Sequence, residues 1–393
     1  MSDPRFADEA VSLEVLRERA FNLRWAEVPE DVIPLTAADP DFPVAAEIRE
    51  AIKAWIDKGY FSYGPAAGLP EFRAAAATML RERKAMDAKP EQVLATNSAA
   101  AALETAAQFM LSAGDEAIIS DPVDFLFGRS VEHAGGVAVR WPCDPLTGEV
   151  DFDALGERIT SKTKMIGLCN PLNPIGKVWT RAELERLAAI AEAHDLWILS
   201  DEIWSDIVFG EAEHISIASL SPEVARRTIT VTGLSKSFGL AGLRIGVLHG
   251  GSDEAVEGLL ETSGARSTAN GAATLSQVGA IAAWERGWTW FEAFRAHLES
   301  QRDYAAGRLQ AMPGVHIRPP EGCYVLFPSI RGTGRGSEDL AAHLLENHRV
   351  AVVPGAARWF GPGAEGHLRI CFSTSRKILS EGLDRIEAGL AGL

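Results

Sequence analysis

The stretch TITVTGLSKSFGLAGLRIGVLHG (residues 228–250) contains two short apolar runs, 228–233 and 244–250, joined by a turn rich in glycine and serine. Apolar runs of this length, bounded by turn residues, are typical of buried strands. Lys236 lies in the turn, just after the first run, and open α/β sheets bind ligands beyond the carboxyl ends of their strands. The stretch therefore predicts a buried sheet with Lys236 at its ligand-binding edge. A lone lysine in such a turn is also typical of an exposed loop.

The same alternation of apolar runs and helical patterns continues on both sides of this stretch. MIGLCN (165–170) and LWILSDE (196–202) are further short apolar runs, and Thr180 with Glu183 forms a capping box that opens a helix between them. Alternating strands and helices predict an α/β fold. We expect a large, mostly parallel sheet covered by helices on both faces, plus a smaller α/β domain built from the C-terminal part and the N-terminal segment.

The pattern along the chain suggests three regions. We expect residues 1–43 to form a segment that packs on or near the active site, because their periodicity is poor. Residues 44–285 are expected to form the large ligand-binding domain. Residues 286–393, which begin within a long helical stretch and continue with short strands and helices, are expected to form the smaller domain.

Composition excludes several classes of function. The chain has 393 residues, 47% of them apolar, and a formal net charge of −16, so nucleic acid and anionic membrane surfaces would repel it. No stretch is long and apolar enough for a membrane span, and the polar, acidic N-terminus is unlike a signal peptide. The four cysteines are far apart, which indicates free thiols and no metal site. We expect a soluble, cytoplasmic protein. The cysteines are Cys143, Cys169, Cys323 and Cys371.

The neighbours of Lys236 give its amine a chemical context. A lysine that forms a Schiff base needs a nearby cation or a desolvated site, so that some of its amine is uncharged at neutral pH. Arg244 follows eight residues later, and its planar fork suits a phosphate dianion, to which Ser235 would also donate. A lysine beside a phosphate cup indicates a site for pyridoxal phosphate.

Two further residues follow strands and fit this cofactor. The pyridine ring withdraws electrons best when its nitrogen is protonated, which requires an acid. Asp201 ends the apolar run before that of Lys236, although a helix or turn cap is an equal alternative for Asp201 taken alone. The turn NPLNPIG (170–176) follows another run, and an asparagine amide there could donate to the phenolic oxygen of the cofactor.

Residues 233–246 resemble the lysine signature of the class I/II aminotransferases of pyridoxal phosphate fold type I, and the resemblance covers nearly the whole chain. The further matching stretches are LTAADPDFP (35–43), YGPAAGLPEFR (63–73), TNSAAAAL (96–103), NPLNPIGK (170–177), SDEIW (200–204) and LRICFS (368–373).

The resemblance implies how the cofactor is held. Lys236 would bind it as a Schiff base and then move a proton between the substrate α-carbon and the cofactor. Asp201 would pair with the pyridine nitrogen, and Asn173 would donate to the phenolic oxygen. The phosphate would be bound at a helix N-terminus by Ser98, Ala99 and Ala100. Ser235 and Arg244 would complete the phosphate cup.

The resemblance also implies substrate contacts and a homodimer. Arg369 matches the arginine that grips the substrate α-carboxylate, with help from Asn173 and from the backbone of Ala38, where the family usually has glycine. A structural salt bridge is the alternative for Arg369. Tyr63 matches a tyrosine that reaches the phosphate of the neighbouring subunit, which implies shared active sites in a homodimer.

Two positions depart from the family pattern. Asp124 stands where an aromatic residue usually stacks on the cofactor ring, and a carboxylate cannot stack. Either Phe125 or another aromatic residue takes over, through a local shift that leaves the stacking imperfect, or the ring face meets a polar contact. Trp204 stands where a tyrosine usually donates to the phenolic oxygen, and an indole N–H can donate but cannot accept or ionise.

The expected function is amino transfer from an L-amino acid to a 2-oxo acid. A C–S β-lyase is the alternative, because NLRW (22–25), GKVWT (176–180) and DEIWSDIVF (201–209) resemble the cystathionine β-lyase branch of the family. A non-catalytic regulatory protein is less consistent with a retained Schiff-base lysine. A dinucleotide dehydrogenase lacks support, since no GxGxxG follows an early strand. Arg24 and Arg129 are candidates for recognising an acidic substrate, although surface salt bridges are the commoner role of arginine.

Overall fold

A seven-stranded sheet forms the centre of the computed structural model, which describes residues 3–267 and 270–392. The strand order is β2-β8-β7-β6-β5-β3-β4, and β8 runs antiparallel to both of its neighbours while the other pairs are parallel. The strands are β2 (Val93–Thr96), β3 (Glu116–Asp121), β4 (Val137–Pro142), β5 (Thr163–Cys169), β6 (Trp197–Asp201), β7 (Thr228–Gly233) and β8 (Gly246–Gly250).

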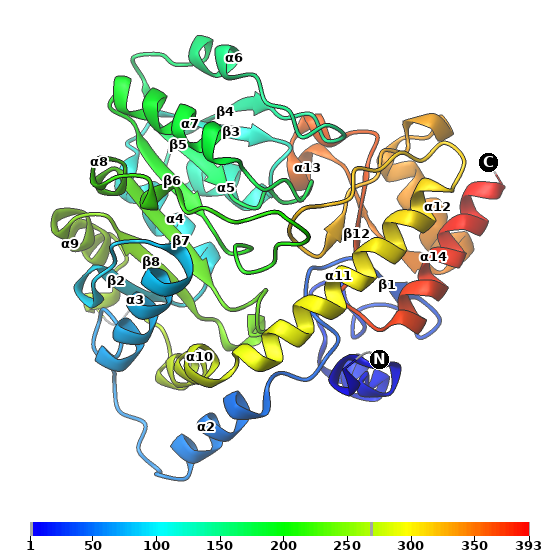
Figure 1. Ribbon diagram of the computed structural model, residues 1–393, viewed down its shortest axis with the longest axis horizontal. Coiled ribbons are helices and arrows are strands. Elements are labelled where there is room, and N and C mark those ends of the chain that lie inside the picture. Colours follow the sequence, from blue (N-terminus) through cyan, green and yellow to red (C-terminus); the bar gives the residue numbers. More distant parts are fainter. Residues whose placement is uncertain (1–2, 268–269, 393) are drawn as a thin grey trace.

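Helices cover both faces of this sheet, which confirms the predicted α/β fold (Figure 1). The central strands are buried along nearly their whole length, as expected for parallel strands covered on both faces. The capping box of Thr180 and Glu183 opens α7, as predicted. The helices in this part of the chain are α2 (Ala46–Ile56), α3 (Pro70–Lys84), α4 (Ala99–Met110), α5 (Phe125–His133), α6 (Phe152–Glu157), α7 (Arg181–Ala193), α8 (Pro222–Arg226), α9 (Asp253–Thr262) and α10 (Thr274–Arg286).

The C-terminal part forms a smaller layer of strands and helices. Its antiparallel sheet has the order β11-β12-β9. The long helix α11 runs from the large sheet region into this smaller part (Figure 1). The strands are β9 (Val325–Leu326), β10 (Val350–Ala351), β11 (Val353–Pro354) and β12 (Leu368–Cys371), and the helices are α11 (Trp288–Gln310), α12 (Ser337–His348), α13 (Ala357–Phe360) and α14 (Arg376–Ala391).

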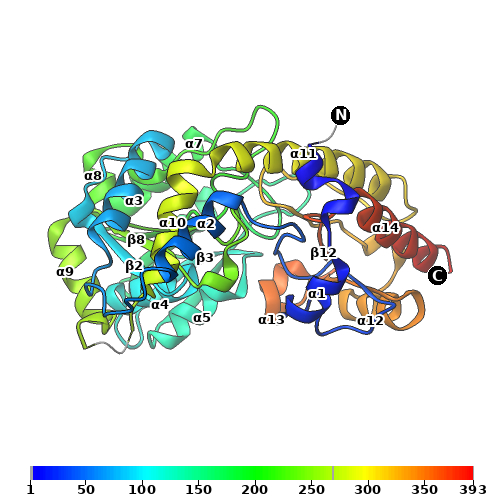
Figure 2. The ribbon, with the colours of Figure 1, turned by 90° about the horizontal axis from the view of Figure 1, so that it is seen from below.

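The N-terminal segment, which includes α1 (Leu13–Arg19), packs on the C-terminal part. Strand β1 (Ile33–Pro34) pairs in parallel with β10, and the N–H of Lys377 donates to Asp8 at 2.9 Å. The segment lies beside α14 in both views (Figures 1 and 2). The smaller part therefore combines the described N-terminal segment with the C-terminal part, while the domain boundaries at 43/44 and 285/286 stay a prediction.

All four cysteines are free and buried. Across residues 3–267 and 270–392, we find no helix with the length and apolar character that crossing a bilayer requires.

Candidate active site

A cavity of about 460 Å³ opens where the carboxyl ends of the parallel strands meet the smaller part of the chain. Its wall brings together predicted site residues that are far apart in the sequence, because parallel strands present their carboxyl ends at one sheet edge. The sequence-predicted residues that line it are Ala38, Ser98, Ala99, Ala100, Asp124, Asn173, Asp201, Trp204, Ser235, Lys236, Arg244 and Arg369.

Lys236 projects into this cavity from the turn after β7. Its Nζ donates to the backbone oxygen of Ala38 at 2.7 Å and lies 5.2 Å from the centre of the Trp204 ring. Burial lowers the pKa of this amine, while the carboxylate of Asp39 opposes the shift and the guanidinium of Arg369 adds to it. A larger share of the amine is therefore uncharged than in an exposed lysine, as a nucleophilic amine requires.

Asp201 is the last residue of β6, the strand that pairs with β7. Its Oδ1 accepts from the N–H of Ile203 at 3.0 Å. Burial raises the pKa of Asp201 to about 7, and the nearby carboxylates of Asp124 and Glu202 add to the rise. A carboxylate in this position is strongly stabilised by any cationic group that enters the cavity, such as a protonated pyridine nitrogen.

The raised pKa of Asp201 predicts a pH-dependent stability once the cofactor is removed. Between about pH 4 and about pH 7 the folded protein keeps a proton on Asp201 that the unfolded chain releases, so stability falls as pH rises, by about 2–4 kcal/mol. Urea unfolding of the cofactor-free protein at about pH 5 and about pH 8 measures the larger part of this loss. Asp201→Asn should lose most of this pH dependence, while its side-chain oxygen can still accept from the N–H of Ile203. An equal pH dependence in both proteins would contradict the assignment.

One side of the cavity is built around the start of α4. Ser98 caps this helix by accepting from the N–H of Ala101 at 3.1 Å, so the first-turn N–H groups of Ala99 and Ala100 lack intrahelical partners. A Cβ on Gly246 would come within 2.5 Å of the Ser98 backbone, so glycine is required for β8 to approach the helix start this closely. The helix start therefore offers free donors and a favourable dipole to an anion.

Ser235 and Arg244 add further donors on this side of the cavity. Both line the cavity with the start of α4, and Arg244 stands exposed at a left-handed turn with φ of 51°. Within the described ranges, no carboxylate pairs with Arg244. A guanidinium, a hydroxyl and a helix N-terminus together make a donor set suited to a phosphate dianion.

Arg369 on β12 faces the cavity from the smaller part of the chain. Its Nη1 donates to Oδ1 of Asn173 at 3.4 Å, and its Nη2 donates to the backbone oxygen of Thr36 at 3.3 Å. The Nε–H of this buried guanidinium has no partner among the described residues. Arg369 is not held in a tight structural salt bridge, since the carboxylate of Asp124 is 3.9 Å away. The fork therefore remains available to a small carboxylate.

Asp124 and Asn173 stand together beside Arg369. Asn173 follows β5, and its Nδ2 donates to Oδ2 of Asp124 at 2.8 Å. The other oxygen of Asp124 accepts from the N–H of Leu126 at 3.2 Å and caps α5. The neighbouring Phe125 lines the cavity but packs edge-on against Trp359, with ring centres 5.8 Å apart. The position expected to hold a stacking ring therefore holds a fixed carboxylate.

Tyr324 is a component of the site that the sequence analysis missed. It is fully buried, its hydroxyl donates to the backbone oxygen of Ala38 at 3.1 Å, and its ring packs edge-on against Trp204 with centres 4.7 Å apart. Lys236 and Tyr324 thus share one acceptor. Tyr324 stands in the apolar run CYVLF, whose only sequence signal is that of a strand.

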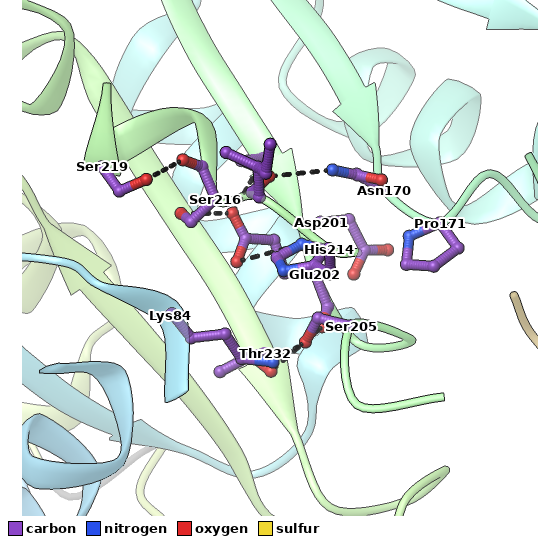
Figure 3. Close-up of polar contacts among 12 residues, drawn as sticks. Lys84, Asn170, Pro171, Asp201, Glu202, Ser205, His214, Ser216, Ser219 and Thr232 are labelled. Atoms are coloured by element: carbon purple, nitrogen blue, oxygen red, sulfur yellow. Dashed lines mark hydrogen bonds and ion pairs between the residues drawn. The ribbon is translucent and has the colours of Figure 1, made fainter. Parts of the chain in front are cut away.

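A second missed group supports the turn after Asp201 from behind. Oε1 of Glu202 accepts from Ser216 at 2.7 Å, and its Oε2 lies 3.6 Å from Nε2 of His214 (Figure 3). Burial raises the pKa of Glu202 and lowers that of His214. Lys84 at the end of α3 contacts Ser205 (Figure 3) and pairs with Asp206 at 2.9 Å, which ties the turn to a helix more than a hundred residues away.

Three candidates lie outside the cavity. Tyr63 is 93% exposed and lines a separate surface pocket with Tyr60 and Phe61. Arg24 is buried in a pair with Asp41, and Arg129 is exposed on α5. The suggestion that Arg24 and Arg129 bind an acidic substrate has no support from this geometry, because neither lines the cavity.

The fold and this site together define a class of protein. A partly desolvated lysine, a buried acid and a phosphate-type donor set converge at the strand ends of an α/β sheet. These groups fit pyridoxal phosphate, whose aldehyde, ring nitrogen and phosphate need such partners. The class is therefore that of pyridoxal phosphate enzymes.

Comparison with known proteins identifies the family within that class. Residues 30–386 match the family model described as aminotransferase class I and II, and the chain belongs to this family. The protein is a pyridoxal phosphate-dependent aminotransferase. The predicted family, fold, cofactor and enzyme class are thereby confirmed.

Several relatives support this assignment. The chain is 34% identical to an aspartate aminotransferase of Pyrococcus horikoshii, over 92% of each chain, and 35% identical to one of Bacillus sp. (strain YM-2), over 91% of each. An aromatic aminotransferase structure from Pyrococcus horikoshii OT3 is 32% identical with a TM-score of 0.86, covering 97% of this chain and 99% of that one. A PLP-bound structure from Clostridium difficile 630 is 29% identical with a TM-score of 0.90, covering 98% and 99%. These relatives favour amino transfer over the β-lyase alternative.

Proposed function

We propose that Lys236 is the residue that bonds the cofactor and moves the proton during amino transfer from an L-amino acid to a 2-oxo acid. The observation that carries this proposal is that Lys236, Asp201, Asn173 and Arg369 meet in one cavity with the start of α4. Among the lysines of the described ranges, Lys236 alone lines this cavity.

Each residue has a distinct task in this proposal. The bound cofactor supplies an electron sink for the negative charge that develops at the substrate α-carbon. Asp201 holds the ring nitrogen protonated, and the start of α4 with Ser235 and Arg244 holds the phosphate. Asn173 and Trp204, which line the same cavity, would donate to the phenolic oxygen of the cofactor. Arg369 orients the substrate through its α-carboxylate, so that Nζ of Lys236 can take the proton from the α-carbon.

A half-reaction tests amino transfer against β-elimination. Purified holoenzyme is mixed with an amino acid and no 2-oxo acid, and the keto product is quantified. Transfer predicts a single equivalent of 2-oxo acid per subunit, with turnover resuming when an acceptor is added, because the amino group stays on the enzyme. Continuous release of pyruvate and ammonia from a sulfur amino acid without an acceptor would overturn the proposal.

We also propose that two copies of the chain form a homodimer in which Tyr63 reaches the phosphate of the partner's site. Tyr60, Phe61 and Tyr63 are strongly exposed, and with Trp55 they line a surface pocket of about 640 Å³. Large exposed aromatic side chains that cluster in this way are typical of protein interfaces. The four free cysteines are consistent with a reducing compartment, and we place the enzyme in the cytoplasm.

Shared sites predict complementation between two impaired variants. Tyr63→Ala should weaken cofactor binding, and Lys236→Ala should be inactive. Unfolded together and refolded, the two should form mixed dimers that each contain one intact site, so activity should rise to about a quarter of the wild-type value. Size-exclusion chromatography with light scattering checks the dimer. Activity equal to the sum of the separate variants would argue against shared sites.

A further inference from the structure

We propose that Asp124 selects the substrate side chain, so that the enzyme uses amino acids with a basic side chain and discriminates against dicarboxylic ones. This inference rests on the proposed function, because it takes Arg369 as the anchor of the substrate α-carboxylate. It concerns Asp124 because, of the charged side chains that line the cavity in the described ranges, it alone has no task in the proposed reaction.

The charges of the cavity support this choice. The charged side chains that line it in the described part of the chain are Asp124, Asp201, Lys236, Arg244 and Arg369. In the proposed reaction, four of them have partners. Asp201 meets the ring nitrogen and Lys236 the cofactor carbonyl, while Arg244 meets the phosphate and Arg369 the α-carboxylate of the substrate. Asp124 has no assigned partner, and the substrate side chain is the remaining group that could contact its carboxylate.

Asp124 is fixed in place as a carboxylate acceptor. One oxygen accepts from the N–H of Leu126 at 3.2 Å and the other from Nδ2 of Asn173 at 2.8 Å. Both donors are neutral, so they orient the carboxylate without cancelling its charge. The side chain remains 21% exposed, which leaves lone pairs accessible from the cavity.

Arg369 and Asp124 form only a loose ion pair, which a substrate carboxylate bound to the fork would weaken. The closest approach between the two side chains is 3.9 Å, which is beyond hydrogen-bond distance. A substrate carboxylate that takes the fork at close range competes with Asp124 for the same positive charge. The net charge around the bound substrate is then negative on the Asp124 side.

Among the described residues that line the cavity, Lys236, Arg244 and Arg369 are the cations, and none is left for a second carboxylate. Arg24 is buried against Asp41, and Arg129 lies exposed outside the cavity. Around Asp124 the wall is apolar and aromatic, with Leu126, Trp359 and Phe360. An alkyl chain that ends in an ammonium group suits such a wall, because its stem packs on apolar surface while its charge meets the carboxylate.

Binding of two inert acids to the holoenzyme tests the charge at Asp124 without turnover. Pentanoate and glutarate share one carboxylate and one chain and differ only at the far end, which is a methyl group or a second carboxylate. Calorimetry should show pentanoate binding on the order of tenfold more tightly than glutarate. Asp124→Asn removes the charge and keeps one acceptor oxygen, which can serve the helix cap at Leu126 or Nδ2 of Asn173 but not both, and it should remove most of this difference.

A matched donor series then tests the substrate class. Ornithine, norvaline and glutamate present an ammonium, a methyl and a carboxylate group at similar reach. We expect kcat/KM to fall in that order, and Asp124→Asn to raise the glutamate-to-ornithine ratio on the order of a hundredfold. Asp153→Asn, which changes an exposed carboxylate on α6, is the control. It should leave unchanged both the glutamate-to-ornithine ratio of kcat/KM and the ratio of pentanoate to glutarate affinity.

The outcomes separate this inference from the proposed function. Glutarate binding as tightly as pentanoate, as when a neighbouring subunit supplies a cation, would overturn the role of Asp124. Ratios that do not move in Asp124→Asn would overturn it as well. If no donor transfers its amine while the two acids keep their expected order, the proposed function fails and the charge assignment stands.

Discussion

Replacing Lys236 with alanine is expected to lower kcat/KM for amino transfer by at least about 10⁴-fold. The variant loses both the amine that bonds the cofactor and the base that takes the α-proton. No other lysine of the described ranges lines the cavity, so none can substitute without a rearrangement of the chain. Steady-state kinetics with saturating cofactor measure the loss, and the absorbance of the bound cofactor should change at the same time.

Lys164→Ala provides the matched control. Lys164 is exposed on β5, outside the cavity, and its amine donates to the backbone oxygen of Ser161 at 3.4 Å, so its loss should leave activity unchanged. Added small amines should restore part of the activity of Lys236→Ala, because they supply the missing base in solution. A Lys236→Ala enzyme with more than a tenth of wild-type activity would refute the assigned role.

Replacing Arg369 with lysine is expected to raise KM for the amino acid by about a hundredfold, with a smaller change in kcat. Lysine keeps the positive charge but loses the planar fork that holds a carboxylate through two parallel hydrogen bonds. It also loses the two arms that donate to Asn173 and to the backbone of Thr36. Initial rates over a range of amino acid concentrations separate KM from kcat.

The corresponding surface change tests whether any arginine-to-lysine substitution has this effect. Arg358 on α13 is exposed and pairs with Glu338, and Arg358→Lys should leave KM within about twofold of wild type. If Arg369→Lys kept the wild-type KM, or lost kcat alone, the α-carboxylate would have to bind elsewhere in the cavity.

The sequence allowed the fold and the convergence of the site to be predicted because both depend on local patterns. Apolar runs indicated buried strands, and the residue at the end of each run had to lie at the shared carboxyl edge. Asp201 and Lys236 follow neighbouring parallel strands, so their proximity follows from the order of the sheet. Ser98 caps α4 at the same edge, as the family pattern implied.

Contacts between distant segments could not be predicted in the same way. Lys84 supports the turn after Asp201 from α3, and no local pattern distinguishes it from the surface lysines of other helices. Arg24 was a candidate for substrate binding, yet the fold of the N-terminal segment buries it against Asp41. Asp124 was recognised as a departure, but its contacts with Asn173 and Arg369 depend on three separate strands.

The central claim is that Lys236 carries the cofactor, and one chemical measurement tests it most directly. Borohydride reduction of the holoenzyme fixes the cofactor to the amine that holds it, and trypsin digestion with mass spectrometry then locates the modified lysine. We predict a modified peptide spanning residues 228–244, uncut at Lys236, at close to one equivalent per chain. Modification at a different lysine, with Lys236 unmodified and cleaved by trypsin, would contradict the account.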